Sequence, residues 1–156
     1  MTESHLVKSS SLSRTKLDQI GRCKTIPPFY ISVEGWRFDT NQQAIFYTIE
    51  IGIELEQEVL VREKEYRYSE LAKFHKQLVS HFPVVPDFPP KKFFGSTDQA
   101  FVRKRQTDLQ KYCSQLSDIE NLTRFPPFVS FFQYQSLKSR WAAECSAYEK
   151  PLVPQM

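Results

Sequence analysis

The spacing of the apolar residues changes near Tyr66, and this change restricts the folds open to the chain. Residues 47–55 place an apolar side chain at every odd position, which is the period of a strand with one buried face. Residues 29–36 and 58–65 also read as strands, the latter short, charged and edge-like. Residues 68–82 instead space their apolar side chains as a helix does. Three consecutive strands followed by helices predict an α+β fold, with a three-stranded antiparallel meander packed on a helical subdomain.

A cluster of prolines interrupts the helical part. Four prolines fall within residues 83–90, so the first helix must end by Phe82 and an extended proline-rich loop must follow it. A second helix is expected to begin near Ser96 or Asp98. Its predicted buried face consists of Phe101, Arg105, Leu109, Tyr112 and Leu116. A short helix near Pro126 and a terminal helix within residues 134–149 complete the outline.

The chain of 156 residues has the length of one domain with tails. Residues 1–25 are polar and serine-rich, and we expect a flexible N-terminal tail there. The folded domain is expected to span residues 26–133, and residues 134–156 to form a C-terminal helix and a frayed tail. The longest apolar run has four residues, so neither a membrane span nor a signal peptide is expected.

Catalysis and metal binding find little support in the residue inventory. The four glycines are isolated, so no glycine-rich phosphate loop can form, and no nucleophile motif is present. Cys23, Cys113 and Cys145 lack the close spacing of a zinc site, and reduced thiols in a cytoplasmic setting explain them better. We therefore predict no enzyme, no metal and no cofactor. The absence of a recognition motif also argues against nucleic acid.

Charge is unevenly distributed along the chain. Residues 67–111 carry nine lysines and arginines against four acidic residues, whereas residues 26–66 carry three against eight. The cations sit near the ends of three predicted elements, at Arg67, at Lys91-Lys92 and at 103–105. Arg105 falls on a buried face and therefore needs a partner or a pocket. Either a small polyanion binds between the helices, or Arg105 pairs with a strand carboxylate and Tyr68 is simply core.

The order of several short motifs resembles a known family. These motifs are Arg67-Tyr68-Ser69-Glu70-Leu71, Phe82-Pro83, Phe88-Pro89-Pro90-Lys91, Phe101, Arg105, Leu109, Leu116 and Phe131-Phe132. From about Phe29 to Gln133 the sequence is similar to the phox-homology (PX) domain, the phosphoinositide-binding module of sorting nexins and phagocyte-oxidase subunits. The resemblance implies a three-stranded sheet on a helical subdomain, as the periodicity does.

The resemblance also implies a ligand and the residues that hold it. Arg67 matches the arginine on the 3-phosphate and Tyr68 the aromatic residue under the inositol ring. Lys91 matches the lysine on the 1-phosphate, and Arg105 the arginine on the 4- and 5-hydroxyls. Phosphatidylinositol 3-phosphate is therefore the implied ligand. Two departures are Tyr66, where the family often has a second cation, and Leu71, where it usually has phenylalanine.

Residues beside the implied pocket suggest how a membrane is engaged. Lys92 and Lys104 are additional cations that would favour anionic lipids or another phosphoinositide, and Phe93-Phe94 occupies the stretch that inserts into the bilayer in the family. The function expected from the resemblance is recruitment of the protein to endosomal membranes as a peripheral protein.

A protein-interaction module with weak or altered lipid binding is the alternative. Residues 85–91 have the spacing of a proline-rich ligand for Src-homology-3 domains. The C-terminal helix could instead hold a partner through Leu137 and Trp141, or pack back on the domain.

Overall fold

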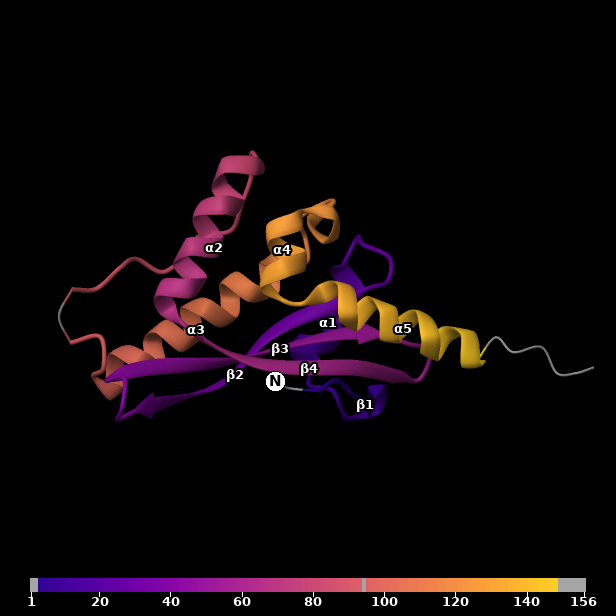
Figure 1. The fold of residues 1–156 in the computed structure, drawn as a ribbon, viewed down its shortest axis with the longest axis horizontal. Coiled ribbons are helices and arrows are strands. Elements are labelled where there is room, and N and C mark those ends of the chain that lie inside the picture. Colours follow the sequence, from indigo (N-terminus) through magenta and orange to yellow (C-terminus); the bar gives the residue numbers. More distant parts are fainter. Residues whose placement is uncertain (1–2, 94, 149–156) are drawn as a thin grey trace, which may run out of the picture.

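The computed structural model describes residues 3–93 and 95–148. One antiparallel sheet contains β1 (His5–Lys8), β2 (Phe29–Asp39), β3 (Ala44–Glu54) and β4 (Glu58–Arg67), in the order β1-β4-β3-β2. The predicted α+β meander is confirmed in β2, β3 and β4. The helices α2 (Tyr68–His81), α3 (Gln99–Leu116) and α4 (Pro126–Phe131) lie over one face of this sheet (Figure 1).

The N-terminal segment departs from the predicted flexible tail. β1 pairs with residues 58–61 of β4, so β4 is not an edge along these residues. A 3₁₀ turn η1 (Ser9–Ser11) leads to α1 (Arg14–Arg22), whose first turn is capped by the Ser13 side chain. Backbone pairing with β4 and burial of Gln19 and Ile20 explain the order of this segment, and neither leaves a periodic signal in the sequence.

Helix α1 also explains why both faces of the sheet are covered at one end. Ile20 joins a small apolar cluster with Tyr30, Val59 and Val61, on the face opposite to the main core. Tyr30 lies directly over Gly52, where an added Cβ would come within 2.3 Å of the ring. Lys16 of α1 pairs with Glu34 at 3.0 Å and with Glu50 at 2.6 Å, which neutralises part of an acidic cluster on this face.

The main core joins the strands to the helical subdomain. The odd-numbered residues of β3 are buried as predicted, and α2 contributes Leu71, Phe74 and Leu78. Helix α3 buries its predicted stripe from Arg105 to Leu116, but Val102 replaces the predicted Phe101, which is only half-buried. A 3₁₀ turn η2 (Leu122–Arg124) precedes α4, whose phenylalanines stack against α2.

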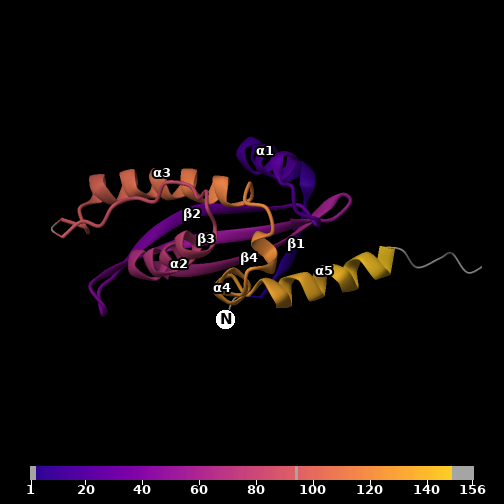
Figure 2. The same cartoon turned by 90° about the horizontal axis from the view of Figure 1, so that it is seen from above.

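The C-terminal helix α5 (Tyr134–Tyr148) extends from the helical subdomain along β3 and β4 (Figure 2). Leu137 is fully buried, and the Trp141 indole donates a hydrogen bond of 2.9 Å to the carbonyl of Glu54. The two anchors considered for a partner are therefore used within the chain itself. In the described part of the chain, no helix combines the length and apolar character that a membrane span requires.

Candidate functional site

A cavity of about 310 Å³ lies where α2 and α3 begin and the proline-rich loop ends. Its walls also include the start of β3. Five residues named by the sequence line it together: Arg67, Tyr68, Lys91, Lys92 and Arg105. The structure thus brings together residues that are up to 38 positions apart in the sequence, from Arg67 to Arg105.

Arg67 is positioned by the junction of β4 and α2. It is the last residue of the strand and the residue before the helix, and its backbone amide donates to the Glu70 carboxylate at 2.9 Å. Glu70 thereby closes the first turn of α2. The Arg67 side chain is exposed and has no ion-pair partner among the described residues. It is therefore free to bind an anion.

Tyr68 connects the helix to the proline-rich loop. Its hydroxyl donates a hydrogen bond of 2.6 Å to the carbonyl of Pro89, and its ring stacks on Phe88 with a centroid separation of 5.4 Å. Burial raises the pKa of this hydroxyl, and the positive charge of Arg105 partly opposes the shift. The net effect keeps Tyr68 neutral, so the ring offers an uncharged face to the cavity.

Arg105 is the most unusual residue of the site, because its side chain is buried. Its guanidinium carbon lies 3.7 Å from the ring centre of Tyr68 and 4.4 Å from that of Phe101. One terminal nitrogen donates to the carbonyl of Pro90 at 3.3 Å. Within the described chain, Nε has no acceptor and no carboxylate pairs with the group. The alternative that Arg105 pairs with a strand carboxylate is therefore wrong.

Tyr47 of β3 is a cavity residue that sequence reasoning assigned only to the core. Burial raises the pKa of its hydroxyl, and the charge of Arg105 opposes that shift. Ser69, Ser96 and Thr97 add further hydroxyl groups to the lining. Short polar residues in turns are common everywhere, so the sequence held no signal that would single out these three.

Of the remaining predicted residues, the two lysines at the end of the loop line the cavity, and Lys104 does not. Lys91 and Lys92 are exposed at the rim, with their ammonium groups over the rings of Phe93 (5.1 Å) and Phe101 (4.2 Å). Phe93 is 78% exposed beside them, and Phe94 lies outside the described residues. Lys104 is not brought into the cavity: it pairs with Asp108 at 3.0 Å on the outer side of α3.

The cavity is therefore cationic, and the start of a helix adds to this character. The first amides of α2 have no partner within the helix, and the helix dipole places partial positive charge at this end. Of the acidic residues described, none lines the cavity. Arginine and lysine side chains beside free amides are the donors that phosphate oxygens prefer.

Comparison with known proteins agrees with this geometry. The sequence model of the PX domain family matches residues 59–135. The fold is similar to the X-ray structure of a designed CISK-PX domain, with a TM-score of 0.54 and 26% sequence identity. That match covers 65% of this chain and 95% of the solved one. The chain contains a PX domain.

The family defines the function in outline. A PX domain is a phosphoinositide-binding or membrane-recruiting module, and PX domains are generally not catalytic. The cationic cavity of this PX domain lies at the junction of β4, α2 and α3, and all of its arginines and lysines fall within the matched residues, whereas the lining from the start of β3 precedes them. Peripheral association with membranes follows from this family membership.

Proposed function

We propose that this PX domain binds the headgroup of phosphatidylinositol 3-phosphate and recruits its protein to endosomal membranes. The observation that carries the proposal is the convergence of Arg67, Lys91 and Arg105 on one cavity whose described lining contains no carboxylate. Cations that lack counter-ions in the free protein favour a polyanionic ligand. The segment that carries this site is residues 26–133, with the N-terminal elements and α5 packed on it.

Each side chain has a role that its position supports. Arg67, next to the free amides of α2, would hold the 3-phosphate, and Lys91 at the rim would meet the 1-phosphate that joins the headgroup to lipid. Arg105, buried deeper, would donate to the 4- and 5-hydroxyls of the ring. A guanidinium in direct contact with these hydroxyls leaves little room for a phosphate on either of them, which favours the singly phosphorylated ring.

Tyr68 requires a small rearrangement to serve as the floor of the inositol ring. The guanidinium of Arg105 lies over the Tyr68 ring in the free domain. A headgroup that stacks on this ring displaces the guanidinium sideways, where its terminal nitrogens and the unpartnered Nε face the ring hydroxyls. Binding thus exchanges a cation–π contact for charged hydrogen bonds, each contributing about 1.5–3 kcal/mol.

Membrane contact extends beyond the headgroup. Phe93 projects beside Lys91 and Lys92, and burial of one phenylalanine in a bilayer contributes about 1.5–3 kcal/mol. Two or three contacts of each kind, less the cost of association, correspond to about micromolar affinity. Recruitment is therefore reversible and is strengthened when several copies bind together. We extend the insertion proposal to Phe94 from the sequence alone.

Sedimentation with vesicles tests the proposal. The wild type should sediment with vesicles that contain phosphatidylinositol 3-phosphate, whereas Arg67→Ala should stay in the supernatant. With vesicles that contain other phosphoinositides, a smaller fraction of either protein should sediment. Lys104→Ala is the matched control, because it removes one nearby cation that does not line the cavity. Equal pelleting of wild type and Arg67→Ala would disprove the lipid site.

The structure favours this function over the Src-homology-3 alternative. Pro89 is buried, Phe88 stacks on His75 at 4.8 Å, and the carbonyls of Pro89 and Pro90 already accept hydrogen bonds. A proline-rich ligand must present these prolines to its partner. The loop instead holds Tyr68 and Arg105 through these two carbonyls, and Lys91 at its end lines the cavity.

A further inference from the structure

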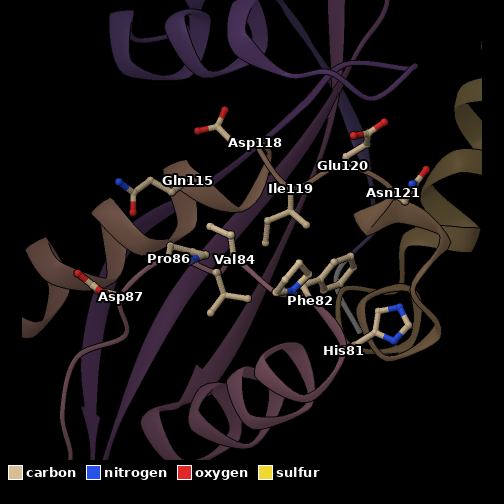
Figure 3. Close-up of a pocket in the computed structure, with 12 residues that line it drawn as sticks. His81, Phe82, Val84, Pro86, Asp87, Gln115, Asp118, Ile119, Glu120 and Asn121 are labelled. Carbon is tan, nitrogen blue, oxygen red and sulfur yellow. The ribbon is translucent and has the colours of Figure 1, made fainter.

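A groove lies at the other end of α2 and α3, away from the cationic cavity. It has a volume of about 750 Å³ and runs between the start of the proline-rich loop and the turn that follows α3. Figure 3 shows the lining, which includes Val84 of the loop and Ile119 of the turn. Arg105 lines the cationic cavity and Gln115 lines this groove, and both residues belong to α3. At a rise of 1.5 Å per residue, the two sites are about 15 Å apart along the helix.

Much of the groove lining is apolar, and part of it is exposed to solvent. Val84 is 80% exposed, and it lies between Pro83 and the partly buried Val85. Phe82, Pro83, Val85, Pro86 and Ile119 complete the apolar lining. An exposed valine inside a concave apolar surface is the arrangement expected where a partner side chain inserts.

The rim of the groove has the opposite charge to the lipid cavity. Asp87, Asp118 and Glu120 line it, and none of the described lining residues is a lysine or an arginine. Asp118 is paired with Arg22 at 2.7 Å, but Asp87 and Glu120 have no ion-pair partner among the described residues. In a protein of net charge +3, this is a local concentration of negative charge.

The ends of two helices strengthen this negative potential. α2 ends at His81 and α3 ends at Leu116, both directly beside lining residues. The carbonyl ends of helices carry partial negative charge and stabilise cations placed near them. The carboxylates and the two helix ends therefore both favour a positively charged ligand.

We propose that this groove binds a linear peptide that carries a lysine or arginine next to a large aliphatic residue. The aliphatic side chain packs on Val84 and Ile119, and the basic side chain meets Asp87 or Glu120 at the rim. Because the groove and the lipid cavity share no lining residues, the domain can hold the peptide and a membrane at the same time. The PX domain then acts as a coincidence adaptor that brings a basic partner to the bilayer.

A peptide selection followed by mutation tests this proposal. A display library of random short peptides is selected on the wild-type chain, and the most enriched peptide is synthesised with a fluorescent label. The expected consensus has a basic residue next to an aliphatic one. Enrichment of acidic sequences, or of no consensus, would overturn the proposal.

Binding of the labelled peptide is then measured by anisotropy on three variants. Val84→Asp should weaken it by about tenfold or more, since it removes the apolar contact, and Glu120→Lys by about threefold. Glu56→Lys is the matched control, because it reverses one exposed charge in the β3–β4 turn and should leave the affinity unchanged. Equal affinity of Val84→Asp and wild type would contradict the assignment.

A measurement on the unmodified chain does not depend on how the variants fold. Titration of the labelled peptide into the wild type should shift the amide resonances of Phe82, Val84, Val85, Asp87 and residues 115–121. Shifts elsewhere would place the peptide on another surface and overturn the proposal. A dimer of the free chain that Val84→Asp dissociates would identify the occupant as a second copy, which would also overturn it.

Discussion

Replacement of Arg105 by methionine separates the function of this residue from its effect on stability. In the free domain the residue is 5% exposed, and its guanidinium has no counter-ion among the described residues and leaves Nε without an acceptor. Methionine has no charge and no polar hydrogen, and its unbranched chain ends at the position that Nε occupies in arginine. The substitution therefore removes an unfavourable buried group and keeps the aliphatic part of the side chain, while the space of the guanidinium between Tyr68 and Phe101 is only partly filled.

The free-energy terms can be compared individually. A buried donor without a partner costs about 1–3 kcal/mol, which the substitution recovers. Loss of the cation–π contacts and of the hydrogen bond to Pro90 costs about 2–3 kcal/mol, and sulfur–aromatic contacts return about 0.3–1.5 kcal/mol per ring. The net change in the free energy of unfolding lies near zero. A change of 1 kcal/mol corresponds to about 2–4 °C in Tm for a chain of this length.

We expect Arg105→Met to change Tm by less than about 4 °C and to weaken binding to phosphatidylinositol 3-phosphate vesicles by about tenfold or more, since charged hydrogen bonds to the ring are lost. Thermal unfolding by circular dichroism and vesicle sedimentation measure the two quantities. Arg103→Met is the control, because Arg103 is exposed on the same helix. A large fall in Tm with unchanged lipid affinity would show that Arg105 is a structural cation and refute the reasoning.

Three further changes test other parts of the account. Phe93→Asp should weaken vesicle binding by about tenfold without changing the affinity for the soluble headgroup, as titration calorimetry can show; equal losses in both would exclude insertion. Gly52→Ala should destabilise the fold by about 1–3 kcal/mol in urea unfolding, because its Cβ would lie 2.3 Å from the Tyr30 ring; unchanged stability would mean that the ring can move away. Burial and the charges of Glu50 and Glu34 raise the pKa of Glu63, so Glu63→Gln should stabilise the fold at neutral pH and lose this advantage as the pH falls through the raised pKa and the wild-type carboxyl becomes protonated; a gain independent of pH would contradict the charge effect.

The strands and long helices were predictable because their side chains follow a regular period. Residues 47–55 alternate strictly, and Pro83 limits the end of α2 to its observed neighbourhood. The N-terminal elements follow no such rule. β1 is ordered by backbone pairing with β4, and α1 is held partly by Gln19, a buried polar residue that contacts the backbone of Cys113. Composition suggested mobility there, whereas long-range contacts give order.

The sequence predicted which residues form the candidate site better than it predicted how their side chains contact one another. The motif resemblance placed Arg67, Tyr68, Lys91 and Arg105 at one cavity, and the structure brings all four to its walls. Lys104 shows the limit of reading a basic cluster as a unit, because adjacent residues on a helix point about 100° apart. The stacking of Arg105 on two rings depends on the path of the loop, which sequence spacing does not specify.

The most direct test of the lipid site is a titration of the isotopically labelled protein with the soluble headgroup, inositol 1,3-bisphosphate. We predict saturable shifts in the amides of Arg67 and Tyr68 and in the side-chain Nε–H of Arg105, since that group gains its first acceptor. Inorganic phosphate at equal charge should produce smaller shifts. Headgroup titration that leaves these three signals unmoved would contradict the central claim that the cavity is the lipid site.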